Sequence, residues 1–488
     1  MRCYRAMAFR LAPAFRLAPA RPPAVAGEAM VATSQPLATR AGLRALERGG
    51  NAVDAAVTAA AVLTVTEPMS TGVGGDAFAL LWTGSDVVGL DAAGPAPRRA
   101  DPDAPVAERG PTSVTVPGAV AGWAALVEQY GSLGLDTLLT DAIAAAEDGF
   151  AVGTVTAADW ADAEAPPELG RRPAVGERVR LPELGATLRR IAEGGPDAFY
   201  RGEIARAVAS STWLDEEDLA SYAPRWVEPL ALPYRGLTVH ELGPPTQGIA
   251  ALEGLGLLAL GEPTLAAQVE CVRLALEDAL AHVRDGADVR GLLEPGALAR
   301  RRSQTARPVA GPRGGTVYLC AADRSRAVSF IQSLYGDFGS GVVAPDTGVV
   351  LQNRGACFAV GGRVEPGRRP YHTLIPGLLT VDGQLHGVFG VMGGFLQAQA
   401  HVQLVSALVD GGLDPQAALD RPRFRVEGGD VLLEEGLWER AGELDGLGLR
   451  PVPSGERSRF GGGQAILVAG DVLVGGSDGR KDGYAAGF

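Results

Sequence analysis

Cysteine and histidine are scarce in this sequence. Its 488 residues include 4 cysteines and 5 histidines. The cysteines lie far apart, at Cys3, Cys271, Cys320 and Cys357, and neither a CxxC pair nor an HExxH motif occurs. A disulfide framework or a zinc site needs more closely grouped ligands. We therefore expect neither of these, and no metal and no cofactor.

The sequence also lacks a long apolar run and an excess of positive charge. No apolar run reaches about 18 residues, so we expect no membrane span. Lys and Arg number 44 against 57 Asp and Glu, which gives a net charge of −13 and a pI near 5.0. This balance argues against a nucleic-acid partner bound through bulk charge. The 67 glycines and 34 prolines follow no fixed period, which excludes a collagen-like chain.

The beginning of the chain lacks the pattern of an export signal. Residues 1–23 are rich in arginine and contain no unbroken apolar core. We interpret residues 1–27 as a disordered extension. The missing signal favours a cytoplasmic protein and leaves export open. The whole chain is 46% hydrophobic, which is enough to bury a large core.

A β-hairpin is predicted in the second half of the chain. The runs 316–323 and 327–334 are rich in β-branched and aromatic residues, and a turn-prone Asp-Arg-Ser-Arg segment joins them. Gly314 and Gly315 precede Thr316, which therefore stands at the first residue of the hairpin. Taken alone, Gly-Gly-Thr is a common junction between a loop and a strand.

Helical patterns dominate the part of the chain before residue 293. Two features there have a functional and a structural interpretation, and we favour the structural one for both. The glycine-rich turn 72–76 lacks the lysine of a phosphate loop and leads into a strand. The acidic run 215–218 fits favourable charges at a helix N-terminus better than a metal site.

Strands dominate the part of the chain after residue 315. Residues 293–315, rich in Arg, Pro and Gly, predict a mobile linker before it. The predicted strands are 316–323, 327–334, 348–352, 356–360, 374–380, 385–392 and 464–475, and the predicted helices are 394–411 and 415–420.

Several segments together resemble the γ-glutamyltransferase family of N-terminal-nucleophile hydrolases, and within it the acylase-like branch. The resemblance covers about residues 28–480 and is carried by segments 49–55, 72–76, 316–323, 338–341, 390–395 and 415–423. It implies an α/β (α+β) fold, a four-layer αββα sandwich with helical elaboration in the N-terminal part. Periodicity alone does not choose this layering.

Proteins of this family cut their own chain before a nucleophilic threonine, and the resemblance places that cut between Gly315 and Thr316. It implies a large piece, 28–315, and a small piece, 316–488, that form a heterodimer. A threonine hydroxyl is a weak nucleophile unless a base takes its proton. No histidine lies nearby in the sequence, but the α-amine freed by the cut has an ordinary pKa of about 7.7–8.0 and can act as that base.

The resemblance also implies roles for other residues. Ser333 matches a position whose hydroxyl contacts the nucleophile. Gly393 and Gly394 match a glycine pair whose backbone N–H groups bind the oxyanion, a task that suits fixed dipoles. The residues expected to line the substrate pocket are Tyr335, Gln352, His372, Thr373 and Phe395.

Five positions depart from the family's pattern. Tyr318 stands where a histidine is usual, and Gly315 where the acylase-like branch has an acidic residue. Ala93 lies in the stretch whose arginine binds the α-carboxylate of a glutamyl group. Ala356 and Cys357 occupy the region of the acid that binds the α-amine. Because an arginine–carboxylate pair is a strong, directional contact, we expect weakened glutamyl recognition.

The predicted function is an amide hydrolase or acyltransferase similar to γ-glutamyltransferases. Thr316 would form an acyl-enzyme from glutathione or another small γ-glutamyl or acyl amide and pass the acyl group to water or an amine. A glutaryl- or cephalosporin-type acylase of the same family is an alternative. Two further alternatives are an unprocessed pseudoenzyme that binds a small molecule, and an α/β binding or interaction protein without covalent chemistry.

Overall fold

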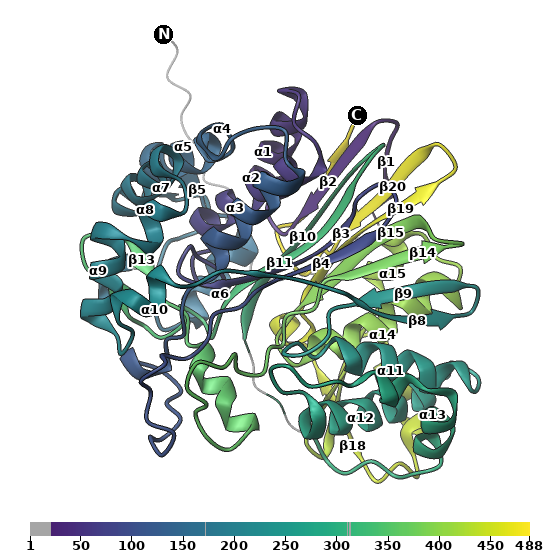
Figure 1. The fold of residues 1–488 in the computed structure, drawn as a ribbon. Coiled ribbons are helices and arrows are strands. Elements are labelled where there is room, and N and C mark those ends of the chain that lie inside the picture. The colour runs from purple at the N-terminus through teal and green to yellow at the C-terminus, as the bar shows by residue number, and fades with distance from the viewer. Residues whose placement is uncertain (1–20, 171, 310, 312–313) are drawn as a thin grey trace.

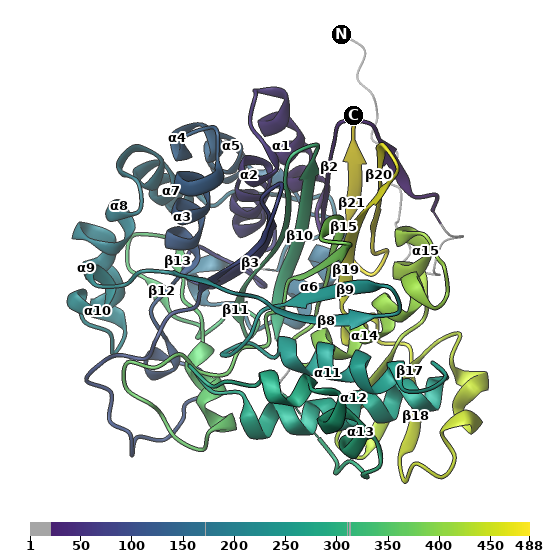
Figure 2. The same ribbon diagram turned by 45° about the vertical axis from the view of Figure 1, so that its right-hand side comes forward.

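Two antiparallel seven-stranded sheets lie face to face, with helices on both outer sides (Figure 1). The computed structural model describes residues 21–170, 172–309, 311 and 314–488. Figure 2 shows helices α1–α5 and α7–α9 on one side of the strands and α11–α14 on the other. This arrangement confirms the αββα sandwich expected from the sequence.

The first sheet has the strand order β1-β20-β19-β15-β14-β9-β8. Its strands are β1 (Ala24–Ala26), β8 (Leu230–Tyr234), β9 (Leu237–Glu241), β14 (Gly377–Val381), β15 (Gln384–Met392), β19 (Gly462–Ala469) and β20 (Val472–Ser477). Its outer face carries α11 (Gly248–Ala259), α12 (Leu265–His282), α13 (Pro295–Arg302) and α14 (Leu396–Val409), while α15 (Pro415–Asp420) packs beside β19 and β20.

The second sheet has the order β21-β2-β10-β11-β3-β4-β7. Its strands are β2 (Ala29–Thr33), β3 (Asp76–Trp82), β4 (Val87–Ala92), β7 (Arg225–Val227), β10 (Gly315–Asp323), β11 (Ala327–Tyr335) and β21 (Tyr484–Gly487). The helices on this side are α1 (Pro36–Glu47), α2 (Ala52–Thr66), α3 (Ala119–Tyr130), α4 (Leu135–Leu138), α5 (Thr140–Asp148), α6 (Thr154–Asp162), α7 (Pro182–Gly194), α8 (Asp197–Tyr200), α9 (Gly202–Ser211) and α10 (Glu216–Ala220).

Strand β10 is buried on both faces because its side chains alternate between two cores. Val317 and Leu319 pack in the core under the helices, together with residues of α2. Tyr318 and Cys320 point the other way and pack between the two sheets. The period of two in a strand explains this division. The sandwich therefore holds β10 rigidly at its centre.

Several segments differ from the sequence-based expectations. The expected single strand 464–475 is a hairpin of β19 and β20. Residues 24–26, placed in the disordered extension, form β1 because they pair with 473–475 of β20; residues 1–20 lie outside the described part of the chain. Within the expected linker 293–315, α13 forms from residues of high helix propensity behind an initial proline. The expected strand 356–360 belongs instead to a 3-10 helix, Arg354–Val360.

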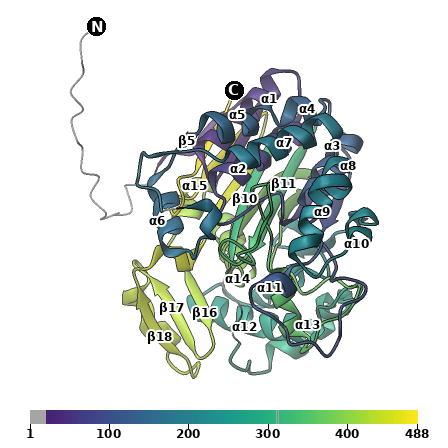
Figure 3. The same cartoon turned by 90° about the vertical axis from the view of Figure 1, so that its left-hand side faces the viewer.

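A small third sheet lies at the edge of the molecule, beside the ends of α12 and α14 (Figure 3). It consists of β16 (Phe424–Glu427), β17 (Asp430–Glu434) and β18 (Arg450–Ser454), and β17 and β18 run parallel. None of the helices in the described residues combines the length and the apolar character needed to cross a membrane.

Candidate active site

Thr316 lies at an irregularity near the start of β10. Gly315 pairs with Tyr335 and Val317 with Gln332, so the register shifts at the threonine. Bulges of this kind re-aim a side chain out of the regular ladder. Thr316 is only 4% exposed, yet it borders a cavity.

The Ser333 hydroxyl connects the two sides of the expected cut. It donates a hydrogen bond of 2.6 Å to the carbonyl oxygen of Gly315. It accepts one of 3.3 Å from the Thr316 hydroxyl and one of 2.7 Å from the backbone N–H of Tyr335. The structure therefore brings together the residues that the sequence proposed for the nucleophile, its hydroxyl partner and the cleavage site.

The turn after β15 places a glycine pair at the same site. Gly393 and Gly394 have φ angles of +133° and +62°, which side chains disfavour and glycine tolerates. Gly393 lines the cavity that Thr316 borders. Within the described part of the chain, the backbone N–H groups of both glycines have no hydrogen-bond acceptor. They remain available to an oxygen of a substrate, as the oxyanion prediction requires.

The cavity beside Thr316 has a volume of about 440 Å³ and a strongly charged lining. Seven ionisable side chains contribute to it: Asp159, Asp162, Asp337, Arg425, Glu456, Arg459 and Lys481. The rest of its wall comes mainly from small residues at the cut and near the glycine pair, namely Ser70, Gly314, Gly315, Thr316, Gly393 and Gly461. A polar molecule of modest size fits such a space.

Two of the predicted pocket residues meet at a buried carboxylate. Gln352 Nε2 donates to one oxygen of Asp76 at 2.9 Å, and His372 Nε2 contacts the other oxygen at 2.9 Å. Burial lowers the pKa of His372, and the nearby positive charge of Arg354 lowers it further. All of these side chains are fully buried. They do not line the cavity itself, and their role in binding stays a prediction.

The other three predicted pocket residues contact either Arg354 or the chain before the expected cut. The Arg354 guanidinium stacks on the ring of Tyr335, 4.5 Å from its centroid, and lies 3.5 Å from the Thr373 hydroxyl. Phe395 packs against the chain before the expected cut: a Cβ on Gly311 would lie 2.0 Å from its Cγ. All three side chains are buried, and none of them lines the cavity.

A charged cluster around Lys481 was not anticipated from the sequence. Its ammonium contacts Asp159 at 2.5 Å. Burial favours the neutral form of Lys481, but the carboxylates of Asp159 and Glu67 outweigh this and raise its pKa. Burial also raises the pKa of Glu67, to about 7, while Ser34 donates to it. One signal was available in the sequence, because Lys481 is its only lysine.

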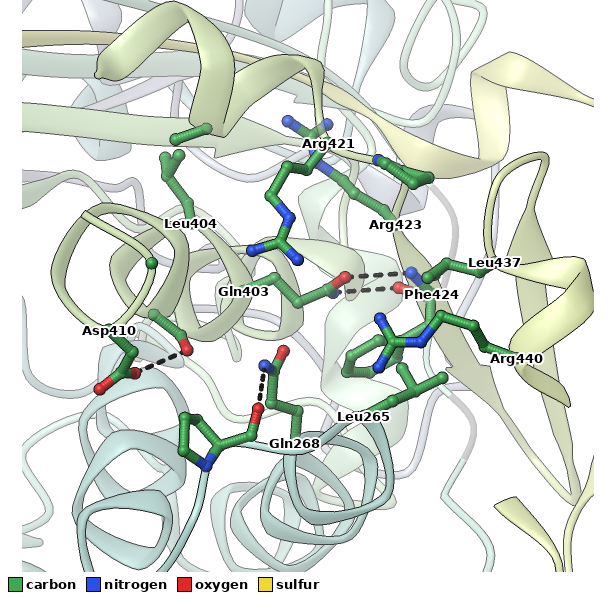
Figure 4. A pocket seen from close by; sticks show the side chains of 15 residues that line it. Leu265, Gln268, Gln403, Leu404, Asp410, Arg421, Arg423, Phe424, Leu437 and Arg440 are labelled. Carbon is green, nitrogen blue, oxygen red and sulfur yellow. Dashed lines mark hydrogen bonds between the residues drawn. The ribbon is translucent and has the colours of Figure 1, made fainter. Parts of the chain in front are cut away.

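A second cavity lies among α12, α14 and the small sheet, and it includes none of the predicted site residues (Figure 4). Its volume is about 250 Å³. Gln403 spans its floor, with both ends of its amide bonded to the backbone of Phe424. Its lining includes Ser406, whose hydroxyl donates to Asp410 at 2.7 Å. The cavity beside Thr316 is the better candidate for chemistry, because it contains the residues expected at the cut and at the oxyanion.

Comparisons with known proteins agree with this geometry. A model of the gamma-glutamyltranspeptidase family matches residues 38–488. The chain belongs to this family. Among its relatives is the oxamate amidohydrolase proenzyme of Klebsiella pneumoniae, 33% identical over 523 residues, which cover 95% of this chain and 99% of the relative. Another is the glutathione hydrolase-like YwrD proenzyme of Bacillus subtilis, 32% identical, with 94% of this chain and 98% of the relative covered.

A solved structure supports the same assignment. The cephalosporin acylase of Bacillus halodurans matches this gamma-glutamyltranspeptidase-family chain with a TM-score of 0.89 and 38% identity. The match covers 100% of this chain and 99% of the acylase. The predicted family and fold are thereby confirmed, and the protein is an enzyme of the gamma-glutamyltranspeptidase type. The match is also consistent with the acylase alternative.

Proposed function

We propose that the chain cuts itself between Gly315 and Thr316 and then acts as an amide hydrolase or acyltransferase with Thr316 as nucleophile. The observation that carries this proposal is the hydrogen-bond chain from the Thr316 hydroxyl through Ser333 to the Gly315 carbonyl oxygen. The relatives' designation as proenzymes supports a cut in this chain as well.

The cut follows from the position of the threonine hydroxyl. Oγ of Thr316 attacks the carbonyl carbon of Gly315, and its proton passes to the amide nitrogen. The C–N bond breaks and leaves an ester between the two residues. The α-amine of Thr316 is freed in the same step. Water then hydrolyses the ester, which restores the hydroxyl of Thr316 and leaves a carboxylate on Gly315. Ser333 assists by donating to the oxygen on which negative charge develops.

The same groups then catalyse the reaction of a substrate amide. The α-amine of Thr316 takes the hydroxyl proton while Oγ attacks the substrate carbonyl carbon. The N–H groups of Gly393 and Gly394 stabilise the oxyanion, and the protonated α-amine gives its proton to the leaving amine. The acyl group stays on Oγ as an ester until water or a second amine attacks it and regenerates Thr316.

After the cut the two pieces should remain together, as 28–315 and 316–488. Both sheets contain strands from each piece: β2 pairs with β10, and β9 pairs with β14. Separation would therefore open both sheets and their shared core. A single species in native mass spectrometry that gives two bands on a denaturing gel is the expected result.

The acyl donor is expected to differ from a strict γ-glutamyl compound. Ala93, Ala356 and Cys357 supply neither an arginine nor an acid for a glutamyl zwitterion, and the acylase match favours an acylase-type substrate. Comparing γ-glutamyl-p-nitroanilide with glutaryl-p-nitroanilide tests this, and the glutaryl compound should be hydrolysed faster.

The same assay separates the remaining alternatives. A chain that stays in one piece and hydrolyses no anilide would be a binding protein, and the proposed function would be wrong. Cleaved protein that prefers the γ-glutamyl compound would be closer to the glutathione hydrolases. The cytoplasmic location stays a prediction of the sequence, which fractionation of the producing cells tests.

A further inference from the structure

Among the 44 basic residues of the chain, Lys481 alone is a lysine. It also lines the cavity that Thr316 borders. Arginine and lysine are not interchangeable, because a guanidinium is a flat fork and an ammonium is a compact point charge with three donors. A chain that uses arginine at every other basic position has its one ammonium at the proposed active site.

The neighbours of Lys481 in the sequence fix its backbone from both sides. Arg480 is buried and donates to Glu434 and Asp478 at 2.8 and 3.0 Å. Asp482 accepts from the backbone N–H groups of Val155 and Thr156 at the start of α6, at 3.1 and 2.9 Å. Such contacts pre-organise a side chain before any ligand binds.

The side chain of Lys481 has room only for a slender stem. A Cβ on Gly462 would lie 2.6 Å from Cγ of Lys481, so the stem lies directly on the β19 backbone. Of the lysine side chain, 14% is exposed. A guanidinium would place its wider fork where the ammonium now meets Asp159 of α6. The packing therefore selects the smaller cation.

The ammonium retains donors beyond the one used by the protein. Among the residues that the structure describes, Asp159 is the single hydrogen-bond acceptor of Lys481. An ammonium has three N–H donors, so two remain for a molecule in the cavity. The pKa of Lys481 is raised, which keeps the group charged at neutral pH.

We propose that Lys481 binds a carboxylate of the substrate and so selects amides that carry one. This inference rests on the proposed function, because it concerns the molecule that Thr316 attacks. The carboxylate has two possible locations, the acyl chain or the leaving amine. Asp162, Asp337 and Glu456 line the same cavity and repel anions, so a substrate carboxylate needs direct contact with a cation to be accepted there. The other cations of the lining, Arg425 and Arg459, both contact the carboxylate of Glu427.

Three anilides separate these locations. Pentanoyl-p-nitroanilide is neutral, glutaryl-p-nitroanilide carries the carboxylate on the acyl chain, and pentanoyl 3-carboxy-4-nitroanilide carries it on the leaving amine. The wild type should prefer one carboxylated compound over the neutral one. The preference is the ratio of kcat/KM for the carboxylated compound to kcat/KM for the neutral one. In Lys481→Met and Lys481→Arg this ratio should fall roughly 10- to 100-fold, which is the effect of losing a charged hydrogen bond. Hydrolysis of the neutral compound should change less than about threefold.

Amine labelling gives a readout that does not depend on turnover. After the cut, the amines available to an acetylating reagent are Lys481 and the two α-amines of the pieces. Free glutarate should slow acetylation of Lys481, and pentanoate should not. Arg189→Lys is the control. Arg189 lies exposed on α7 and pairs with Glu147 of α5. A lysine introduced there should be acetylated equally fast with and without glutarate.

The outcomes separate this inference from the proposed function. Loss of the carboxylate preference in both variants, with glutarate protection in the wild type, supports it. Hydrolysis of all three anilides without preference, or a preference that survives in Lys481→Met, overturns it and leaves Thr316 catalysis standing. Cleaved protein that hydrolyses none of them contradicts the proposed function itself. A fall of equal size for every anilide assigns Lys481 a purely structural role and also overturns the inference.

Discussion

The hydroxyl of Ser333 donates a hydrogen bond of 2.6 Å to the carbonyl oxygen of Gly315. That carbonyl belongs to the peptide bond that breaks in the proposed cut. The pairing of β10 with β11 brings the two residues together. A fixed donor at this oxygen polarises the carbonyl and stabilises the negative charge that grows on it. The uncut chain therefore already holds part of the machinery for its own cleavage.

Replacing Ser333 with alanine should slow self-cleavage. Loss of one such donor lowers the rate of comparable reactions roughly 10²- to 10³-fold. The rate is measured as the appearance of the small fragment by mass spectrometry over time. Ser333→Thr keeps the hydroxyl and should cleave at nearly the normal rate.

Ser329→Ala is the matched control for this prediction. Ser329 is also a buried serine of β11, but its hydroxyl donates to the backbone of Phe389. Its loss should leave cleavage unchanged. If Ser333→Ala cleaves as fast as the wild type, Ser333 has no part in the reaction.

Gly393→Ala should lower kcat of the cleaved enzyme. A side chain disfavours the φ angle of +133°, and the new Cβ would lie 3.2 Å from Cδ2 of Leu396. The backbone must then turn and re-aim the N–H groups that bind the oxyanion. We expect a fall in kcat of roughly 10²-fold or more with little change in KM. Gly412→Ala is the control, since Gly412 has a φ of +59° and open space around it. An undiminished kcat would contradict the oxyanion assignment.

Glu67 should make stability fall as the pH rises. Burial raises the pKa of its carboxyl to about 7 in the folded chain, from an ordinary value of 4.5. Between these values the folded state binds more protons than the unfolded state, so deprotonation favours unfolding. Between pH values below 4.5 and above 7, the free energy of unfolding should fall by on the order of 3 kcal/mol. This pH dependence should be absent in Glu67→Gln.

The measurement is denaturant unfolding at several pH values, with all variants in a Thr316→Ala background so that the chain stays in one piece. Glu67→Gln keeps a group that can bond Ser34. Glu47→Gln, at the exposed end of α1, is the control and should follow the parent. Parallel pH profiles for the parent and Glu67→Gln would show that Glu67 does not titrate in this range.

The hairpin around Thr316 was predictable because its signals are local. β-Branched and aromatic runs flank a turn in which Asp323 accepts from the N–H groups of Ser325 and Arg326. The predicted strands 316–323 and 327–334 agree closely with β10 and β11. Thr316 itself could be proposed only through family resemblance, since Gly-Gly-Thr alone indicates no more than a junction.

Other features depend on contacts that a pattern does not contain. The segment 356–360 is apolar enough for a strand, but a three-residue period places Arg354 and Cys357 on one side of a 3-10 helix, 3.8 Å apart. The Lys481–Asp159 pair joins residues 322 positions apart, and only the folded sandwich brings them together. The single lysine was visible in the sequence, but its location at the cavity was not.

The state of the chain at Thr316 tests the central claim most directly. Purified wild type and Thr316→Ala are incubated and examined by denaturing gel, intact mass and N-terminal sequencing, followed by an anilide assay. We predict two pieces from the wild type, the smaller beginning with Thr316, and a single inactive chain of about 50.3 kDa from the variant. Anilide hydrolysis by an uncut wild-type chain, or by Thr316→Ala, would contradict the claim.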